Sequence, residues 1–287
     1  MKPGHSNLQS NSGLENAEQW HKDLYSLVRA SRHFYHSLQS FLLPHNVKYN
    51  DSSALLWAAS RGRADLVQAI FRIPGANPNT GISSGESPLL AAARHGHAEV
   101  VRLLLAPQPR SSLAAYVNET ARERGDTPLM VAAKAGHVEV VQLLLQDWRV
   151  DVDQGNYDGR TALAQAAISG FPAVAKLLLV TERVEPTMPD GELWSPLTFA
   201  ATAGHLDVVK VLLEGEKRVD VGFGDWNGVT PLMWAVRYGV RHVVEFLLDR
   251  NDEDVALRDG AGRTARMWAE ECGHQDIVEL FDSRGIE

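Results

Sequence analysis

The chain has 287 residues, of which 44% are hydrophobic and 22% charged, values typical of globular proteins. This composition excludes collagen-like, mucin-like and wholly disordered chains. The formal net charge of −8, from 28 Lys and Arg against 36 Asp and Glu, excludes a general electrostatic attraction to phosphate backbones or anionic lipid. We therefore expect neither a nucleic-acid nor a membrane partner. The single cysteine, Cys272, excludes an internal disulfide and a multi-thiolate metal site.

The first fifty residues divide into two parts. Residues 1–15 are polar and lack an apolar core, which predicts a flexible N-terminus without a secretory signal and hence a cytoplasmic or nuclear protein. Residues 16–50 place Trp20, Leu24, Leu27 and further apolar side chains at helical spacing, which predicts an amphipathic helix. Such a helix would cap the apolar end of the following domain or join two copies of the chain, so monomer and dimer both stay open.

A short motif recurs throughout residues 51–287. Its clearest copies are Ser87–Ala93, Thr127–Ala133, Ser195–Ala201 and Thr230–Val236. Weaker copies, in which alanine replaces the proline, begin at Ser53, Thr161 and Thr264. The seven starting hydroxyl residues stand 34, 40, 34, 34, 35 and 34 residues apart, and a glycine nine residues after each keeps these steps. One structural unit is therefore repeated about seven times.

Each position of the unit predicts a part of a helix pair. The side chain of the Ser or Thr can accept a hydrogen bond from a free backbone N–H at the start of a helix. Proline suits the next position, because the N–H that it lacks would have no partner within the helix. Paired alanines let neighbouring helices approach closely, and the glycine suits the left-handed residue that ends a helix. Val100–Leu105 and Val140–Leu145 then provide the apolar stripe of a second helix. The extra six residues in the longest step, within 106–124, predict a recognition loop or a tolerated insertion.

The order Thr-Pro-Leu, paired alanines, Gly-His and Val-Val-x-Leu-Leu-Leu resembles the ankyrin repeat over residues 53 to 281. The resemblance implies an all-α fold, an ankyrin-repeat solenoid in which each unit is a β-turn finger followed by two antiparallel helices. It also implies a concave face and a protein partner. His97, His137, His205 and His274 follow the helix-ending glycines, so we interpret them as partners of backbone groups rather than as metal ligands.

Aromatic residues gather where the resemblance places the concave face. In the ankyrin pattern, the residue before the alanine pair points into that groove; four of the seven residues at this position are aromatic here, and finger residues are expected along the same edge. We predict that the following residues form a binding surface: Trp57, Trp194, Phe199, Trp226, Trp234, Arg237, Tyr238 and Trp268. Asp190, Glu192 and Asp225 are expected on the rim of this groove, where they would orient a partner.

Two functions are compatible with such a surface. The first is an adaptor or scaffold whose aromatic groove binds a protein partner, and the resemblance favours it. The second is an enzyme or binder without metal or cofactor that folds a hydrophobic small molecule for cyclisation or isomerisation, with Glu192 as a desolvated acid or base. A third interpretation assigns the rings no function beyond filling space between repeats. Apart from this role of Glu192 in the second function, no catalytic residue is predicted, and no metal site is predicted with any of the three.

Overall fold

The computed structural model describes residues 53–72, 76–79, 85–106, 115–215, 219–250 and 254–286. Within these ranges the chain forms fourteen α-helices, one short 3₁₀ helix and no strand, in seven helix pairs. The first helices are α3 (Ser53–Ser60), α5 (Pro88–Arg94), α7 (Pro128–Ala135), α9 (Ala162–Ser169), α11 (Pro196–Ala203), α13 (Pro231–Arg237) and α15 (Ala265–Cys272). The second helices are α4 (Ala64–Phe71), α6 (Ala98–Leu105), α8 (Val138–Gln146), α10 (Pro172–Val180), α12 (Leu206–Glu214), α14 (Arg241–Arg250) and α16 (Gln275–Ser283), and the 3₁₀ helix η2 is Asp254–Ala256.

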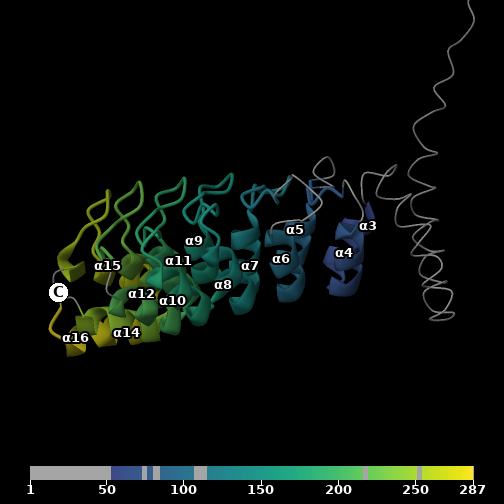
Figure 1. Cartoon of the computed structure of the whole chain (residues 1–287). Helices are drawn as coiled ribbons and strands as arrows, with labels where there is room; N and C mark the ends of the chain where they lie inside the picture. Colours follow the sequence, from purple (N-terminus) through teal and green to yellow (C-terminus); the bar gives the residue numbers. More distant parts are fainter. Residues whose placement is uncertain are drawn as a thin grey trace, which may run out of the picture.

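The predicted all-α solenoid is confirmed. The helix pairs stack side by side, and the turns before the first helices, which we call fingers, project in one row (Figure 1). The predicted flexible segment 1–15 and the predicted helix within 16–50 lie outside the described residues. Every helix in the described ranges is too short or too polar to span a bilayer.

The first helices begin and end where the repeated motif predicts. The hydroxyl of Ser87 accepts a hydrogen bond from the backbone N–H of Leu90, and the five later motif hydroxyls accept the equivalent bond. α7 ends at Gly136, which has a φ of 75°. A left-handed residue of this kind turns the chain sharply into the second helix. Local sequence therefore sets the length of each first helix.

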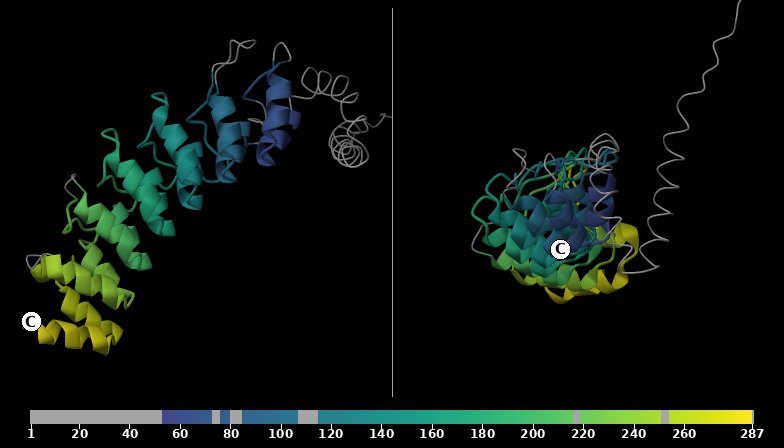
Figure 2. Two further views of the ribbon diagram at one scale, coloured as in Figure 1. Left: turned by 60° about the horizontal axis from the view of Figure 1, so that its bottom comes forward. Right: turned by 45° about the vertical axis from the view of Figure 1, so that its right-hand side comes forward.

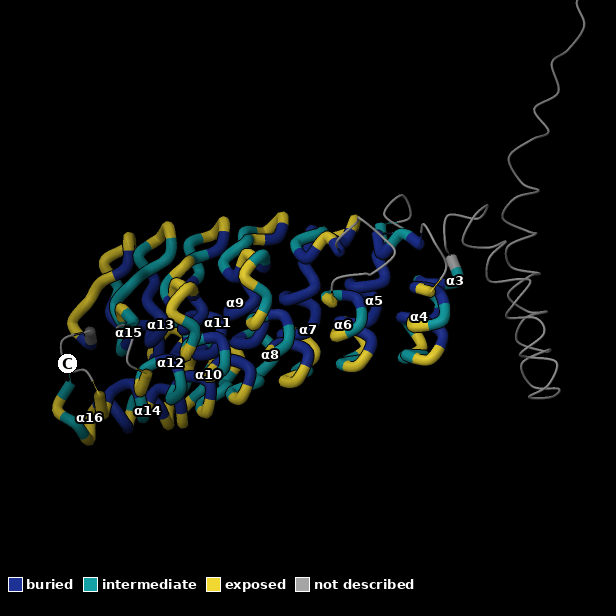
Figure 3. Tube along the Cα trace, in the orientation of Figure 1, coloured by how far each residue is buried: buried dark blue, intermediate teal, exposed yellow. Residues whose placement is uncertain are grey.

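Small side chains decide how the helix pairs stack. The alanine pairs of α3, α5, α7, α9 and α11 are fully buried, and successive first helices approach each other more closely than successive second helices do. A stack that is tighter on one side must curve toward that side, which makes the first-helix layer the inner one. Figure 2 shows the resulting curved array. Along the array, the finger tips are mostly exposed, whereas the helices carry long buried stretches (Figure 3).

Histidines link five of the repeats to the one before, whereas in repeat four the ring of Phe171 lies against the helix-ending Gly136. Nε2 of His97 lies 3.1 Å from the carbonyl oxygen of Ser60, and Nε2 of His205 lies 3.2 Å from that of Ile168. His137, His242 and His274 make the same kind of contact. Because a carbonyl oxygen can only accept, each Nε2–H donates to the open end of the preceding first helix. The interpretation of the four glycine-following histidines as backbone partners is confirmed.

These histidine rings lie against the helix-ending glycines. A Cβ at Gly170 would lie 2.6 Å from Nδ1 of His205, whereas a Cβ at Gly273 would meet nothing within 4 Å. Both glycines have a φ of +74°. We expect Gly273→Ala to lower the free energy of unfolding by about 1–2 kcal/mol, the cost of a side chain in the left-handed region.

Gly170→Ala carries the same backbone cost and in addition displaces His205. We expect Gly170→Ala to lower the free energy of unfolding by about 1–3 kcal/mol more than Gly273→Ala does. Urea unfolding followed by circular dichroism measures both. Equal losses in the two variants would show that the His205 contact adds nothing to the stacking of these repeats.

Candidate functional site

Four aromatic rings form a continuous chain across repeats five and six. Trp194, in the finger before α11, has its ring centroid 5.3 Å from that of Phe199 and 4.6 Å from that of Trp234. Trp234 in turn lies 6.0 Å from Tyr238 at the end of α13. We call Phe199, Trp194, Trp234 and Tyr238 the aromatic row. These spacings are those of tilted, mutually packed rings, so each ring restricts the orientation of the next.

Arginine side chains extend the aromatic row at both ends. The guanidinium of Arg237 lies over the rings of Trp234 and Trp268, 5.0 Å from each centroid. Arg263 lies 3.7 Å from the centroid of Trp268, and Arg160 lies 5.1 Å from that of Phe199. These distances suit cation–π attraction. The row thus continues through Arg237 onto α15.

Aspartates at the finger turns fix the tryptophans of the last two first helices, Trp234 on α13 and Trp268 on α15. Oδ1 of Asp225 accepts hydrogen bonds from the backbone N–H groups of Asn227 and Val229, which closes the turn. Its Oδ2 accepts from the indole N–H of Trp234 at 3.1 Å. One carboxylate therefore holds both the finger and the ring, and the orientation of the ring follows from the shape of the turn.

The neighbouring fingers repeat this arrangement with one change. Oδ2 of Asp259 accepts from the indole N–H of Trp268 at 3.1 Å and also from Arg263. In the preceding repeat the corresponding ring, Phe199, has no N–H, and Arg160 donates to Oδ2 of Asp190 at 3.2 Å instead. The second oxygen of the finger aspartate is satisfied in all three repeats.

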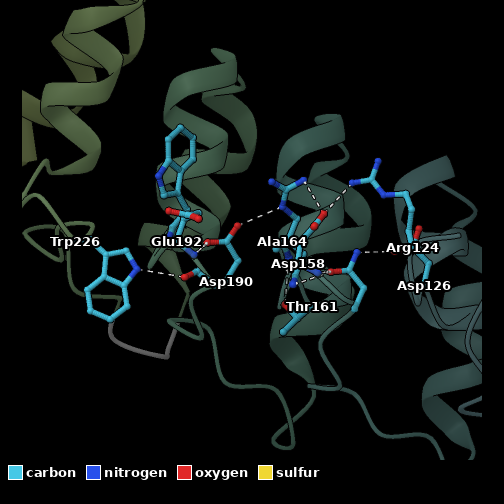
Figure 4. Close-up of polar contacts among 12 residues, drawn as sticks. Arg124, Asp126, Asp158, Thr161, Ala164, Asp190, Glu192 and Trp226 are labelled. Atoms are coloured by element: carbon cyan, nitrogen blue, oxygen red, sulfur yellow. Dashed lines mark hydrogen bonds and ion pairs between the residues drawn. The ribbon is translucent and has the colours of Figure 1, made fainter.

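Backbone and side-chain bonds tie successive fingers together. The indole N–H of Trp226 donates to the carbonyl oxygen of Gly191, and the N–H of Gly191 donates to the carbonyl oxygen of Asp158. The carboxylate of Asp158 pairs with Arg124 at 3.0 Å. Figure 4 shows this ladder running from Trp226 past Asp190 and Asp158 to Arg124. The fingers therefore form a connected edge beside the aromatic row.

The predicted surface residues separate into three groups. Trp194, Trp234, Arg237 and Tyr238 come together and keep part of their surface in solvent. Phe199 and Trp268 join them but are only 8% and 6% exposed, so the expectation that they present open surface is wrong. Side chains of the preceding repeat lie over both rings, Arg160 over Phe199 and Arg237 over Trp268, which agrees with the space-filling interpretation for Trp268.

Two predicted residues lie apart from the aromatic row. Trp226 is 69% exposed at its finger but makes no ring contact with another described residue. Trp57 belongs to α3, at the opposite end of the array from α15 (Figure 1). The fold therefore does not place Trp57 on one contiguous surface with the aromatic row.

The predicted rim acids also differ from one another. Asp190 is buried and bonded to its own finger and to Arg160, so it cannot orient a partner. Glu192 is exposed, which removes the desolvation that a catalytic acid or base at this position would need. The rings of Trp194 and Trp234 pack directly on each other, so they do not enclose a substrate between them. The arrangement can bind an apolar group and an anion.

Sequence reasoning missed one residue beside the row, Leu193. Leu193 has a φ of 60° at the finger position where the other fingers carry Gly159, Gly228 and Gly262, all with positive φ. A side chain in this left-handed region costs about 1–2 kcal/mol relative to a relaxed backbone. The residue that directly precedes Trp194 is therefore strained, and alignment of the repeats with one another would have revealed it.

Replacing Leu193 by glycine removes this strain. Glycine costs about 0.5–1 kcal/mol in chain entropy, so we expect Leu193→Gly to raise the free energy of unfolding by about 0.5–1 kcal/mol. Leu193→Ala keeps a Cβ in the same conformation and should not stabilise the protein. Thermal and urea unfolding of both variants check this, and a loss of stability in Leu193→Gly would show that leucine packing outweighs the strain.

Asp259 makes the stability of the last repeat depend on pH. Burial on its own raises the pKa of this carboxyl, but hydrogen bonds from the backbone and guanidinium of Arg263 and from the Ala261 backbone hold the pKa below its usual value. A lowered pKa means that the stabilisation is present above the unfolded value of about 3.9 and is lost as pH falls through the folded value.

We expect Asp259→Asn to lower the free energy of unfolding by about 2 kcal/mol at neutral pH, because an amide nitrogen replaces the acceptor of Trp268 and Arg263. The difference from the wild type should vanish in acid. Asp225→Asn is the matched control: Asp225 makes the same turn and indole bonds without an ion pair, so its loss should be smaller. Urea unfolding at a series of pH values measures both, and a loss independent of pH would contradict the expectation.

Comparison with known families agrees with this geometry. A family model described as ankyrin repeats (3 copies) matches residues 27–112, 55–156, 110–190, 179–259 and 197–287, which together span most of the chain. No curated protein matches the chain. Ankyrin repeats generally mediate protein–protein interaction, which agrees with the partly exposed aromatic row. Because the matches run through the whole array and each helix pair follows the same motif, the chain belongs to the ankyrin-repeat family.

Proposed function

We propose that the chain is an adaptor that binds a segment of a partner protein on the inner face of repeats five to seven. The family as a whole supports binding of a protein. The position of the aromatic row supports the choice of this face, because the first-helix layer is the concave one, and the row lies on repeats five and six and continues through Arg237 to Trp268 on repeat seven. A solenoid offers a wide surface of this kind rather than a closed pocket.

The observation that carries the proposal is that the row is partly exposed and already fixed. Trp234 is held by the carboxylate of Asp225, by the ring of Trp194 and by the overlying Arg237. Tyr238, 58% exposed, lies directly beside it. Rings that are immobile before binding lose little entropy on binding, and tryptophan, tyrosine and arginine are the residues that most often dominate binding energy.

A displayed library of random short peptides tests the proposal. Peptides that bind the chain are selected, synthesised and measured by fluorescence polarisation. We expect Tyr238→Ala and Trp234→Ala each to weaken binding by about 1–2 kcal/mol, or about five- to thirtyfold, since each removes an exposed part of the row. Tyr238→Ala removes little buried surface, so its effect does not depend on a change of fold.

Trp148→Ala is the matched control, because Trp148 is 85% exposed in the turn after α8 and makes no contact with the row. Binding should be unchanged in this variant. A library that yields no binder, or binders that tolerate both Tyr238→Ala and Trp234→Ala, would contradict the proposed function. Circular dichroism of each variant confirms that the helices are intact.

A further inference from the structure

Arg237 carries a charge that the described part of the protein does not neutralise. Its guanidinium is exposed, and it makes no ion pair or hydrogen bond with another described side chain. The two other arginines that lie over rings of this face are paired: Arg160 with Asp190, and Arg263 with Asp259 and Glu271. Each of these three arginines thus lies over an aromatic ring. Arg160 and Arg263 also pair with a carboxylate, whereas Arg237 has no carboxylate partner among the described residues.

The two indoles hold Arg237 ready for an anion. Trp234 comes from α13 and Trp268 from α15, so adjacent repeats fix the arginine between them through contacts of 5.0 Å each. Both indoles are in turn held by finger aspartates. Ring contacts use the flat faces of a guanidinium and leave its N–H edge free, and that edge matches the two oxygens of a carboxylate.

We propose that Arg237 binds a carboxylate side chain of a partner peptide, so that the surface recognises an acidic residue next to an apolar one. This inference rests on the proposed function and adds the chemistry of the partner. The apolar neighbour contacts Tyr238 and Trp234, which continue the surface directly from Arg237. The partner's Asp or Glu takes the place that Asp190 and Asp259 take on the two paired arginines.

The surroundings favour a carboxylate over a phosphate group. A phosphate carries nearly two negative charges and is usually bound by more than one cation. Near Arg237, however, the next arginine along the surface, Arg263, is already bonded to two carboxylates. The whole chain also has a net charge of −8. The charge of Arg237, which has no ion-pair partner among the described residues, suits a single negative charge.

The tightest peptide from the displayed library serves as the probe. We expect selected peptides to carry Asp or Glu beside an aromatic or aliphatic residue. Changing that acid to its amide should weaken binding about tenfold, and Arg237→Gln should weaken binding of the acidic peptide by a similar factor. Arg237→Gln should not further weaken binding of the amide peptide, because that peptide has already lost the ion pair with Arg237. This double-mutant cycle separates pairing from general charge effects.

Two further variants keep the test independent of folding and of net charge. Arg237→Lys retains the charge without the paired donors and should give an intermediate affinity. Arg241→Gln removes a positive charge from the same repeat, but Arg241 is bonded to Asp276 on α16, so binding should be unchanged. A weakening by Arg241→Gln equal to that by Arg237→Gln would overturn the proposal.

The remaining outcomes distinguish this inference from the proposed function. Binders that need Trp234 and Tyr238 but tolerate Arg237→Gln would overturn the inference and leave the function standing. Independent, additive losses in the cycle would overturn it as well, as would a phosphoserine peptide that binds about tenfold more tightly than its glutamate equivalent. Absence of any binder that depends on the aromatic row would overturn both.

Discussion

Close approach of the first helices is the constraint on which the structure depends. Fully buried alanine pairs, such as Ala166 and Ala167 on α9, bring neighbouring first helices nearer to each other than the bulkier second helices can come. The array therefore curves, and residues one repeat apart on the inner layer come into contact. Trp194 and Trp234 are 40 residues apart in the chain, yet their rings touch because of this spacing.

The finger aspartates connect this stacking to the binding surface. A carboxylate has more acceptor sites than a turn needs, so Asp225 can close its finger with one oxygen and hold Trp234 with the other. The same residue type therefore serves the fold and the site. Arg237 shows the opposite case, since its ring contacts are complete while its charge has no partner within the described residues.

Strain and stability are distributed unevenly over the repeats. Leu193 occupies a left-handed position that other fingers give to glycine, and it stands directly before Trp194. Strain of this kind persists only where surrounding bonds hold the backbone, and here Asp190 accepts from the N–H groups of Glu192 and Trp194 on either side. The finger of repeat five is thus kept in a costly conformation beside the aromatic row.

The repeated motif alone determined the fold class, the number of units and the helix starts and ends, because hydroxyl caps, proline and left-handed glycine act within one turn of chain. It also indicated which rings share a face. Only the tertiary structure decided that Phe199 and Trp268 are covered while Trp234 and Tyr238 stay open, and that Trp57 lies far from them. Exposure depends on which side chains of the same and the preceding repeat lie over each ring: Arg160 and Trp194 over Phe199, and Arg237 and Arg263 over Trp268. The pairing of arginines was decided in the same way: Asp190 meets an arginine from the previous repeat and Asp259 one from its own, whereas Arg237 meets two indoles.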